Sequence, residues 1–167
     1  NNVLIGYLAG DAITTQSDNV CIGSAAGGAL TGTEATFIGK SAGTAVTSGV
    51  GNTAVGYNAF KTSSANGDNN TAIGYKALED MEVGGDGTGN NTALGFSAGL
   101  NLSTGLNNTA IGSLAMGLGN VTGDNNIAIG THTAGAAITT ATGYDITDAE
   151  DNILIGNAAG SSITDND

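Results

Sequence analysis

The chain has little of the material from which a globular core is built. Its 167 residues include no tryptophan, no proline and no arginine, and aromatic residues make up only 4%. Charged residues make up 11%, against about 25% in typical soluble domains. Glycine is abundant instead, with 29 residues, and most of the 40% hydrophobic fraction is aliphatic. This composition excludes a bulky core of Leu, Phe and Trp and favours close stacking of the backbone.

Positive charge and cysteine are also scarce. The chain has three lysines and fifteen acidic residues, which gives a net charge of −12. This balance excludes binding to nucleic acid through phosphate neutralisation. The single cysteine, Cys21, excludes an internal disulfide bond. No apolar run reaches the roughly 20 residues of a transmembrane helix, so we expect no membrane insertion in this segment.

A short repeat fills the chain from end to end. The segment Asn70-Thr71-Ala72-Ile73-Gly74 recurs at residues 108–112, where it ends at Gly112. Aligned on its glycine, the repeat has nine copies, which end at Gly6, Gly23, Gly39, Gly56, Gly74, Gly95, Gly112, Gly130 and Gly156. Successive glycines are 17, 16, 17, 18, 21, 17, 18 and 26 residues apart. We therefore interpret residues 1–167 as a single repeat domain cut from a longer protein.

Each position of the repeat forms a column of similar residues when the copies are aligned. The −1 column, one residue before the glycine, is always Ile, Val or Leu, and the −3 column is always Val, Thr or Ile. The −2 column is mostly alanine, with Leu, Cys or Phe in the other copies. The −4 column is asparagine in eight copies, among them Asn52, Asn70, Asn91, Asn108, Asn126 and Asn152.

These columns predict an all-β fold. β-Branched residues at alternate positions, closed by a glycine, are typical of a short strand that ends in a turn. A period of about 17 residues suits one coil of a parallel β-solenoid or β-roll, and nine copies predict about nine coils. We expect the asparagines to stack as a ladder that satisfies backbone groups of the neighbouring coil.

The two faces of each strand suggest more than one chain. Side chains alternate between faces, so the −1 and −3 columns share one face and the −2 column lies on the other. We expect the large aliphatics of the −1 and −3 columns to fill the coil. The −2 column would then be an exposed apolar stripe, which association about the stacking axis would hide. The alternative is a thicker monomeric solenoid that buries both faces itself.

Candidate catalytic residues are few, and none forms a recognisable site. The only histidine, His132, lies where the motif slips by one residue, and we interpret it as a surface residue. Cys21 lies in the −2 column and reads as a small buried residue. A pair of carboxylates could cleave a glycan, and the candidates are Glu79, Asp80, Glu82, Asp86, Glu150 and Asp151. Their spacing singles out no pair, so we expect solvated loop acids and no enzyme.

Calcium is the metal that best suits these oxygen-rich loops. The candidate ligands are Asp86, Asp145, Asp148 and Asp151. Neither the loop that contains Asp86 nor the loop that contains Asp145, Asp148 and Asp151 matches the calcium-binding nonapeptide or the EF-hand loop. We therefore expect no resident cofactor and keep calcium as an open alternative.

The repeat resembles two groups of fibrous proteins. The motif Asn-x-Ala-Ile-Gly-x-x-Ala is similar to the head repeats of trimeric autotransporter adhesins, and residues 69–78 resemble repeats of bacteriophage tail fibres. The resemblance covers the whole chain and implies a left-handed β-roll of three chains, on a virion or bacterial cell surface outside the cell. It also implies attachment to a host receptor or glycan. The period is longer and less even than in adhesin heads, which favours the viral fibre.

Two other function classes stay open. A fibre-borne glycan hydrolase would use the loop carboxylates. An ice-binding solenoid would need a flat, exposed array of threonines. The −3 threonines share a face with the large aliphatics, and other copies hold Val or Ile in their place, so we expect them to be buried, which argues against ice binding.

Overall fold

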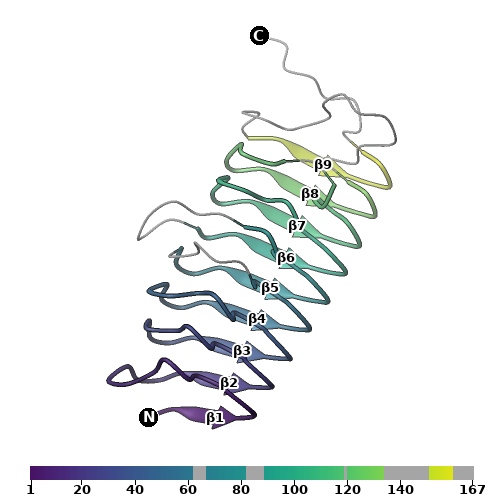
Figure 1. Cartoon of the computed structure of the whole chain (residues 1–167). Coiled ribbons are helices and arrows are strands. Elements are labelled where there is room, and N and C mark those ends of the chain that lie inside the picture. The colour runs from purple at the N-terminus through teal and green to yellow at the C-terminus, as the bar shows by residue number, and fades with distance from the viewer. Residues whose placement is uncertain (62–66, 82–88, 119, 134–150, 160–167) are drawn as a thin grey trace.

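The chain forms a parallel β-solenoid, as predicted. The computed structural model describes residues 1–61, 67–81, 89–118, 120–133 and 151–159. These residues wind through about seven turns of the solenoid and contain no helix. One sheet runs along the stack in sequence order (Figure 1). Its strands are β1 (Val3–Ile5), β2 (Val20–Ile22), β3 (Thr36–Ile38), β4 (Thr53–Val55), β5 (Thr71–Ile73), β6 (Thr92–Leu94), β7 (Thr109–Ile111), β8 (Ile127–Ile129) and β9 (Ile153–Ile155).

The register of the sheet follows the sequence repeat. Every strand pairs in parallel with the next, and each column pairs with itself, as Thr71 does with Thr92 and Ile73 with Leu94. The copies therefore stack residue on residue, and the alignment made on the glycines is also the structural alignment. A slip by one residue would exchange the inner and outer faces, so this register fixes which side chains form the core.

The glycine that ends each strand is required by the coil above it. Gly6 has a φ of +133°, and a Cβ there would lie 2.6 Å from the carbonyl oxygen of Gly23. The same approach recurs from Gly23 to Gly130 along the column. Only glycine combines this φ with so close a backbone neighbour.

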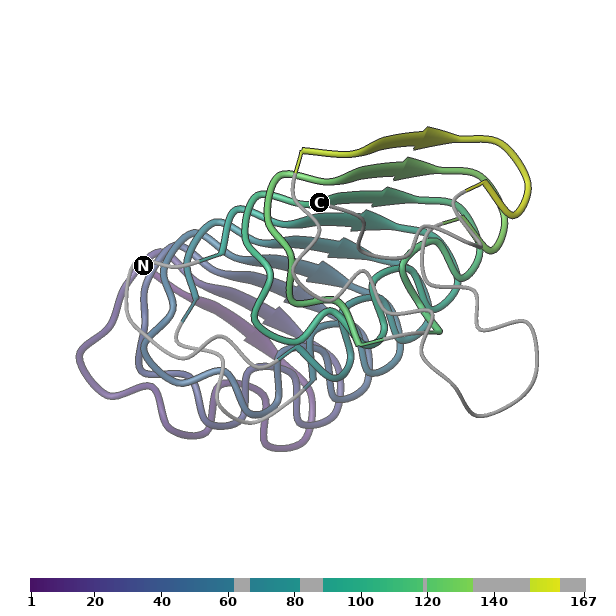
Figure 2. The same cartoon turned by 90° about the horizontal axis from the view of Figure 1, so that it is seen from above.

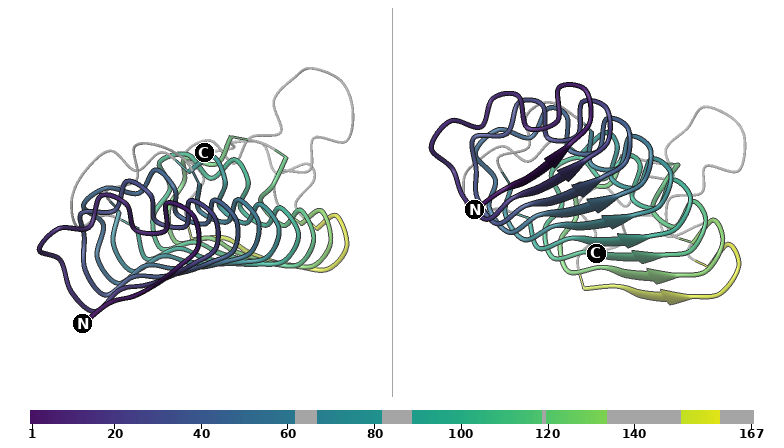
Figure 3. Two further views of the ribbon diagram at one scale, coloured as in Figure 1. Left: turned by 60° about the horizontal axis from the view of Figure 1, so that its bottom comes forward. Right: turned by 90° about the horizontal axis from the view of Figure 1, so that it is seen from below.

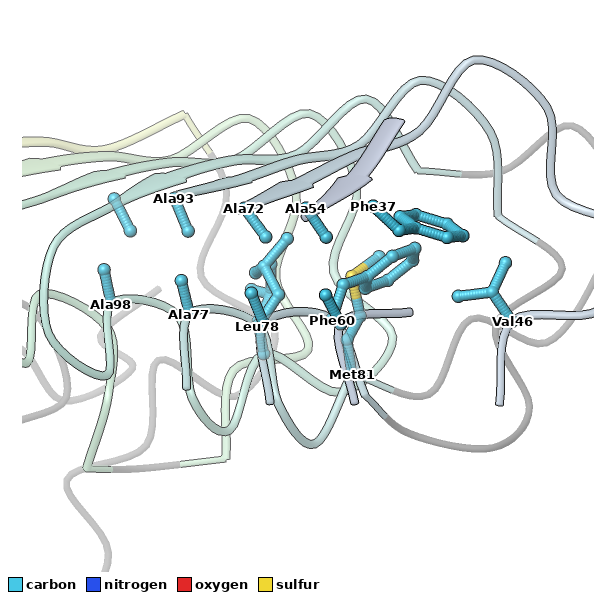
Figure 4. Close-up of a cluster of buried hydrophobic side chains, with 14 of the residues drawn as sticks. Phe37, Val46, Ala54, Phe60, Ala72, Ala77, Leu78, Met81, Ala93 and Ala98 are labelled. Carbon is cyan, nitrogen blue, oxygen red and sulfur yellow. The ribbon is translucent and has the colours of Figure 1, made fainter. Parts of the chain in front are cut away.

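The core is a narrow double layer of small side chains. The −2 column points inward from the strands and meets the alanines that lie three residues after each glycine (Figure 4). Ala72 and Ala77 are examples from one coil, and both are fully buried. Larger side chains, such as Leu78 and Met81, fill the space between these alanines and the turns. In the coil of Gly130, the alanine position is taken by Thr133, whose hydroxyl donates to the Gly156 carbonyl at 2.7 Å.

Core volume is balanced within each coil. Where the −2 residue is large, the residue four after the glycine is itself glycine, as in the pair Phe37 and Gly43. A Cβ at Gly43 would overlap the Phe37 ring. In three of the five copies with alanine at −2, the second position holds a large side chain, and Ala54 is paired with Phe60. The coil of Ala93 has glycine at Gly99, and Leu78 from the neighbouring coil fills that space.

The predicted asparagine ladder is present. The Oδ1 atom of Asn91 accepts the backbone N–H of Asn108 at 2.8 Å, and its Nδ2 donates to the carbonyl of Gly105 at 3.0 Å. The same Oδ1 bond to the next coil is made by Asn2, Asn19, Asn52, Asn70, Asn108 and Asn126. The ladder therefore satisfies buried backbone groups that the short strands leave unpaired.

The stack is a twisted column. Figure 2 shows the coils as a staircase, with the strands along one side and the turns along the other. In the right-hand view of Figure 3, the strand arrows turn gradually from β1 to β9, as expected for a sheet of L-residues. Within the described ranges, no helix has the length and apolarity that crossing a bilayer requires.

Candidate interaction surface

The structure corrects the expected assignment of the strand faces. The −2 column is inside, and the −1 and −3 columns lie on the outside. In β5, Ala72 is fully buried, whereas Ile73 is 38% exposed. The physical reason is space. Where a large side chain such as Phe60 or Leu78 already fills the inside of the coil, the −2 position has room only for alanine, so the bulky β-branched residues are placed outside. The exposed apolar stripe predicted for the −2 column is instead formed by the −1 and −3 columns, which we call the outer face.

The outer face is apolar and uncharged along its whole length. No copy places a charged residue in either column. The −1 column includes the exposed side chains of Ile5, Ile38, Ile73, Leu94 and Ile155. The −3 column carries five successive threonines, from Thr36 in β3 to Thr109 in β7, all of which are half-buried. The expectation that these threonines are buried is therefore wrong.

An aromatic ladder lies at the edge of the outer face, directly after the glycine column. It consists of Tyr57, Tyr75 and Phe96, one from each of three successive coils. The ring centroids of Tyr57 and Tyr75 are 5.3 Å apart with an interplanar angle of 14°, and those of Tyr75 and Phe96 are 5.3 Å apart at 3°. The rings therefore stack face to face along the axis of the solenoid. They are 42%, 44% and 52% exposed, respectively.

All three lysines of the chain belong to the coils of this ladder or to the coil before it, and two of them contact its rings. Lys40 Nζ lies 5.9 Å from the centroid of the Tyr57 ring, and Lys76 Nζ lies 5.8 Å from that of Tyr75. Lys61 belongs to the same coil as Tyr57. In a chain of net charge −12, the cationic side chains are thus confined to three neighbouring coils.

A buried carboxylate holds two of these lysines. Glu79 accepts a hydrogen bond from Asn58 Nδ2 at 2.7 Å and pairs with Lys76 at 2.9 Å and Lys61 at 3.8 Å. The hydrogen bond from Lys76 to Glu79 raises the pKa of the Lys76 ammonium above 10.5. The contribution of the Lys76 charge is therefore fully present below the ordinary lysine pKa and is lost as pH rises through the raised value.

The carboxylates considered for glycan cleavage do not form a catalytic pair in the described residues. Glu79 is a buried ion-pair partner rather than the solvated loop acid that was expected. Asp80 is exposed, and its backbone N–H donates to the Leu100 carbonyl at 3.0 Å. Asp151 is an exposed turn residue with a φ of +59°. Glu82, Asp86 and Glu150 lie outside the described residues.

The remaining candidates are the metal ligands, His132 and Cys21. No group of three potential ligands comes together in the part of the chain that the structure describes. Of the calcium candidates, Asp86, Asp145 and Asp148 lie outside that part. His132 is half-exposed, and its backbone N–H donates to the Ser113 carbonyl at 2.9 Å. Cys21 is buried, as predicted, and burial raises the pKa of its thiol to about 11, so it is a poor nucleophile.

The aromatic ladder was not predicted, although a signal for it is present in the sequence. Tyr57, Tyr75 and Phe96 each follow the repeat glycine directly. Side chains at equivalent positions of adjacent coils are about 4.8 Å apart, so aromatic residues in three successive copies must stack. The ladder could have been predicted by aligning the column directly after the glycine in the same way as the columns before it.

Comparison with known proteins adds no assignment. No family model, no curated protein and no solved structure matches this chain.

Proposed function

We propose that this segment is part of a trimeric fibre on a virion or bacterial cell surface, and that it serves attachment or spaces an attachment domain from its anchor. The observation that carries the proposal is the outer face, an uncharged apolar stripe that follows the whole stack. An exposed stripe of this length marks an interaction surface in a soluble protein. The proposal includes no catalytic step and no resident cofactor.

The partner that best fits the outer face is a second copy of the same face. Nine strands at about 4.8 Å per strand give a stripe about 40 Å long. In this proposal, each strand belongs to one coil. A partner with the same repeat length would match it strand for strand. Cyclic symmetry about the stacking axis brings identical columns together. The twist of the sheet allows such columns to wind about one another.

The number of chains comes from the resemblance of the repeat to adhesin heads and tail fibres. In a trimer, the −1 and −3 columns of three chains would line a common axis, and the acidic turns would lie outside. Charge would then keep the fibres soluble and separate from one another. The location outside the cell follows from the same resemblance.

The mass of the segment in solution tests the proposal. We expect light scattering to give three times the chain mass of 16.1 kDa at both low and high salt. The variant Ile73→Lys places a charge in the centre of the outer face and should reduce the assembly to single chains. The matched control is Thr104→Lys, at an exposed turn residue remote from the strands. A folded monomer of the unmodified chain would overturn the trimer.

Ice binding is a second candidate, because the threonine column that was expected to be buried is only half-buried. Five threonines in register are the array that this function requires. The twist of the sheet and the neighbouring aromatic ladder make the outer face less flat than ice binding demands. Thermal hysteresis measured on the purified segment, together with its mass, separates the two functions. A trimer that hides the threonines has no ice-binding activity, whereas a monomer with hysteresis would support the second candidate.

A further inference from the structure

We propose that the aromatic ladder and its lysines bind an acidic oligosaccharide that lies along the stacking axis. This inference rests on the proposed attachment function and names the class of ligand that this segment takes. It is carried by two features that overlap along the stack, the rings on the coils of Gly56, Gly74 and Gly95 and the lysines on the coils of Gly39, Gly56 and Gly74. One is the stack of exposed rings, and the other is the gathering of all lysines of an acidic chain.

The stack has one open end. Each aromatic ring covers its neighbour, and the next residue of the column after Phe96 is Ser113. Tyr57 and Phe96 each have one ring partner among the described residues, but Lys40 lies over the Tyr57 ring, and Phe96 is the most exposed of the three rings. Serine leaves the next position of the stack free for the flat apolar face of a sugar ring. The edges of Tyr57 and Tyr75 can offer hydroxyl groups to the sugars that follow.

The lysines select for negative charge. Lys76 and Lys61 are balanced in part by Glu79, whereas Lys40 forms no ion pair with any described residue. Elsewhere, the charge of −12 repels an acidic glycan. A carboxylated sugar is therefore attracted to one part of the stack and is held in one register along it.

The dimensions suit a short oligomer. From the coil of Lys40 to that of Ser113 there are four coil spacings, or about 19 Å at roughly 4.8 Å each. A ligand of about four sugar units can cover this distance. One end would stack on Phe96, and its carboxylates would reach Lys76 and Lys40. The site is a linear strip rather than a pocket, so we expect weak binding by a single copy and strong binding by several.

The test uses a galacturonate tetramer and its methyl ester, which has the same sugars but no charge. We expect calorimetry to show that the acid binds more tightly than the ester and that salt weakens only the acid. Phe96→Ser should weaken both ligands roughly threefold to tenfold. Lys40→Ser should weaken only the acid, by about twofold to fivefold. Both changes introduce residues that the same column already holds at Ser113 and Ser24.

Tyr7→Ser is the matched control, because Tyr7 lies in the same column but outside the ladder. Equal affinity for acid and ester, no binding of either, or equal losses with Tyr7→Ser would overturn the inference. If Phe96→Ser changes the mass of the assembly and neither ligand binds, a second copy covers the ladder. Because mass and sugar binding are separate readouts, the trimer can hold while the sugar site fails, and the reverse is also true.

Discussion

At the scale of single residues, the glycine column determines how closely the coils can stack. A Cβ at Gly74 would overlap the carbonyl oxygen of Gly95, and the φ of Gly74 is +137°. Two costs therefore combine at this position: a backbone conformation unsuited to other residues, and a clash with the next coil. Gly156 has the first cost alone, because a Cβ there would meet only Ala159 Cβ, at 3.9 Å, among the described residues.

The pair of glycines separates these two costs. We expect Gly156→Ala to lower the free energy of unfolding by about 1–3 kcal/mol through backbone strain. Gly74→Ala should cost a further 1–3 kcal/mol or so, because the coils must move apart. Urea denaturation of both variants provides the comparison. Equal losses at the two positions would show that the close approach of the coils does not limit the residue at Gly74.

At the scale of one coil, the balance between two inner positions determines the packing. Phe37 with Gly43 and Ala54 with Phe60 are two arrangements of the same core. Phe60 has a φ of +49° and Gly43 one of +58°, so the same backbone accepts either residue. The fold therefore tolerates sequence change within a coil as long as the two volumes compensate.

This compensation can be measured with a double substitution. Phe37→Ala alone leaves a cavity and should lower the free energy of unfolding by about 3–5 kcal/mol. Adding Gly43→Phe rebuilds the arrangement of the next coil and should recover a substantial part of that loss. Gly43→Phe alone should destabilise, because its side chain would overlap the Phe37 ring. Additive losses in the double variant would contradict the compensation.

The same coil shows what the sequence could and could not predict. Repeat length, strand positions, parallel register and the asparagine ladder could be predicted from the sequence. Each follows from aligned columns of similar residues, because equivalent residues of successive coils lie next to one another in the stack. The inside of the coil was assigned wrongly, because large aliphatics were expected to form the core. Ala72 is buried and Ile73 is exposed, since the inner space of this coil is already filled by one large side chain, Leu78. The pairing of Phe37 with Gly43 was the signal that identifies the inner column.

The lysines show a second limit on what could be predicted from the sequence. Glu79 reads as one more loop acid, yet it is buried with Asn58, Lys61 and Lys76. These four residues come from two successive coils and are brought together only by the stacking. Their grouping could be predicted from the register but not from the spacing along the chain.

At the scale of the whole molecule, each coil contacts mainly the coils on either side. The strands pair only with their neighbours in sequence order, and each asparagine bonds to the next one. Stability is then close to a sum of coils and of the interfaces between them. Damage to one coil should therefore stay local.

Asn91→Ala tests this locality, because Asn91 lies near the middle of the stack. The substitution leaves the Asn108 amide and the Gly105 carbonyl without their bonds, at a cost of about 1–3 kcal/mol for each buried group. Hydrogen exchange should quicken at Thr92, Asn108 and Thr109. The amides of Val20 and Thr36, several coils away, should keep their protection. Asn101→Ala removes one bond of a half-buried side chain and is the control. Equal loss of protection along the chain would contradict this locality and would mean that the coils unfold as one unit.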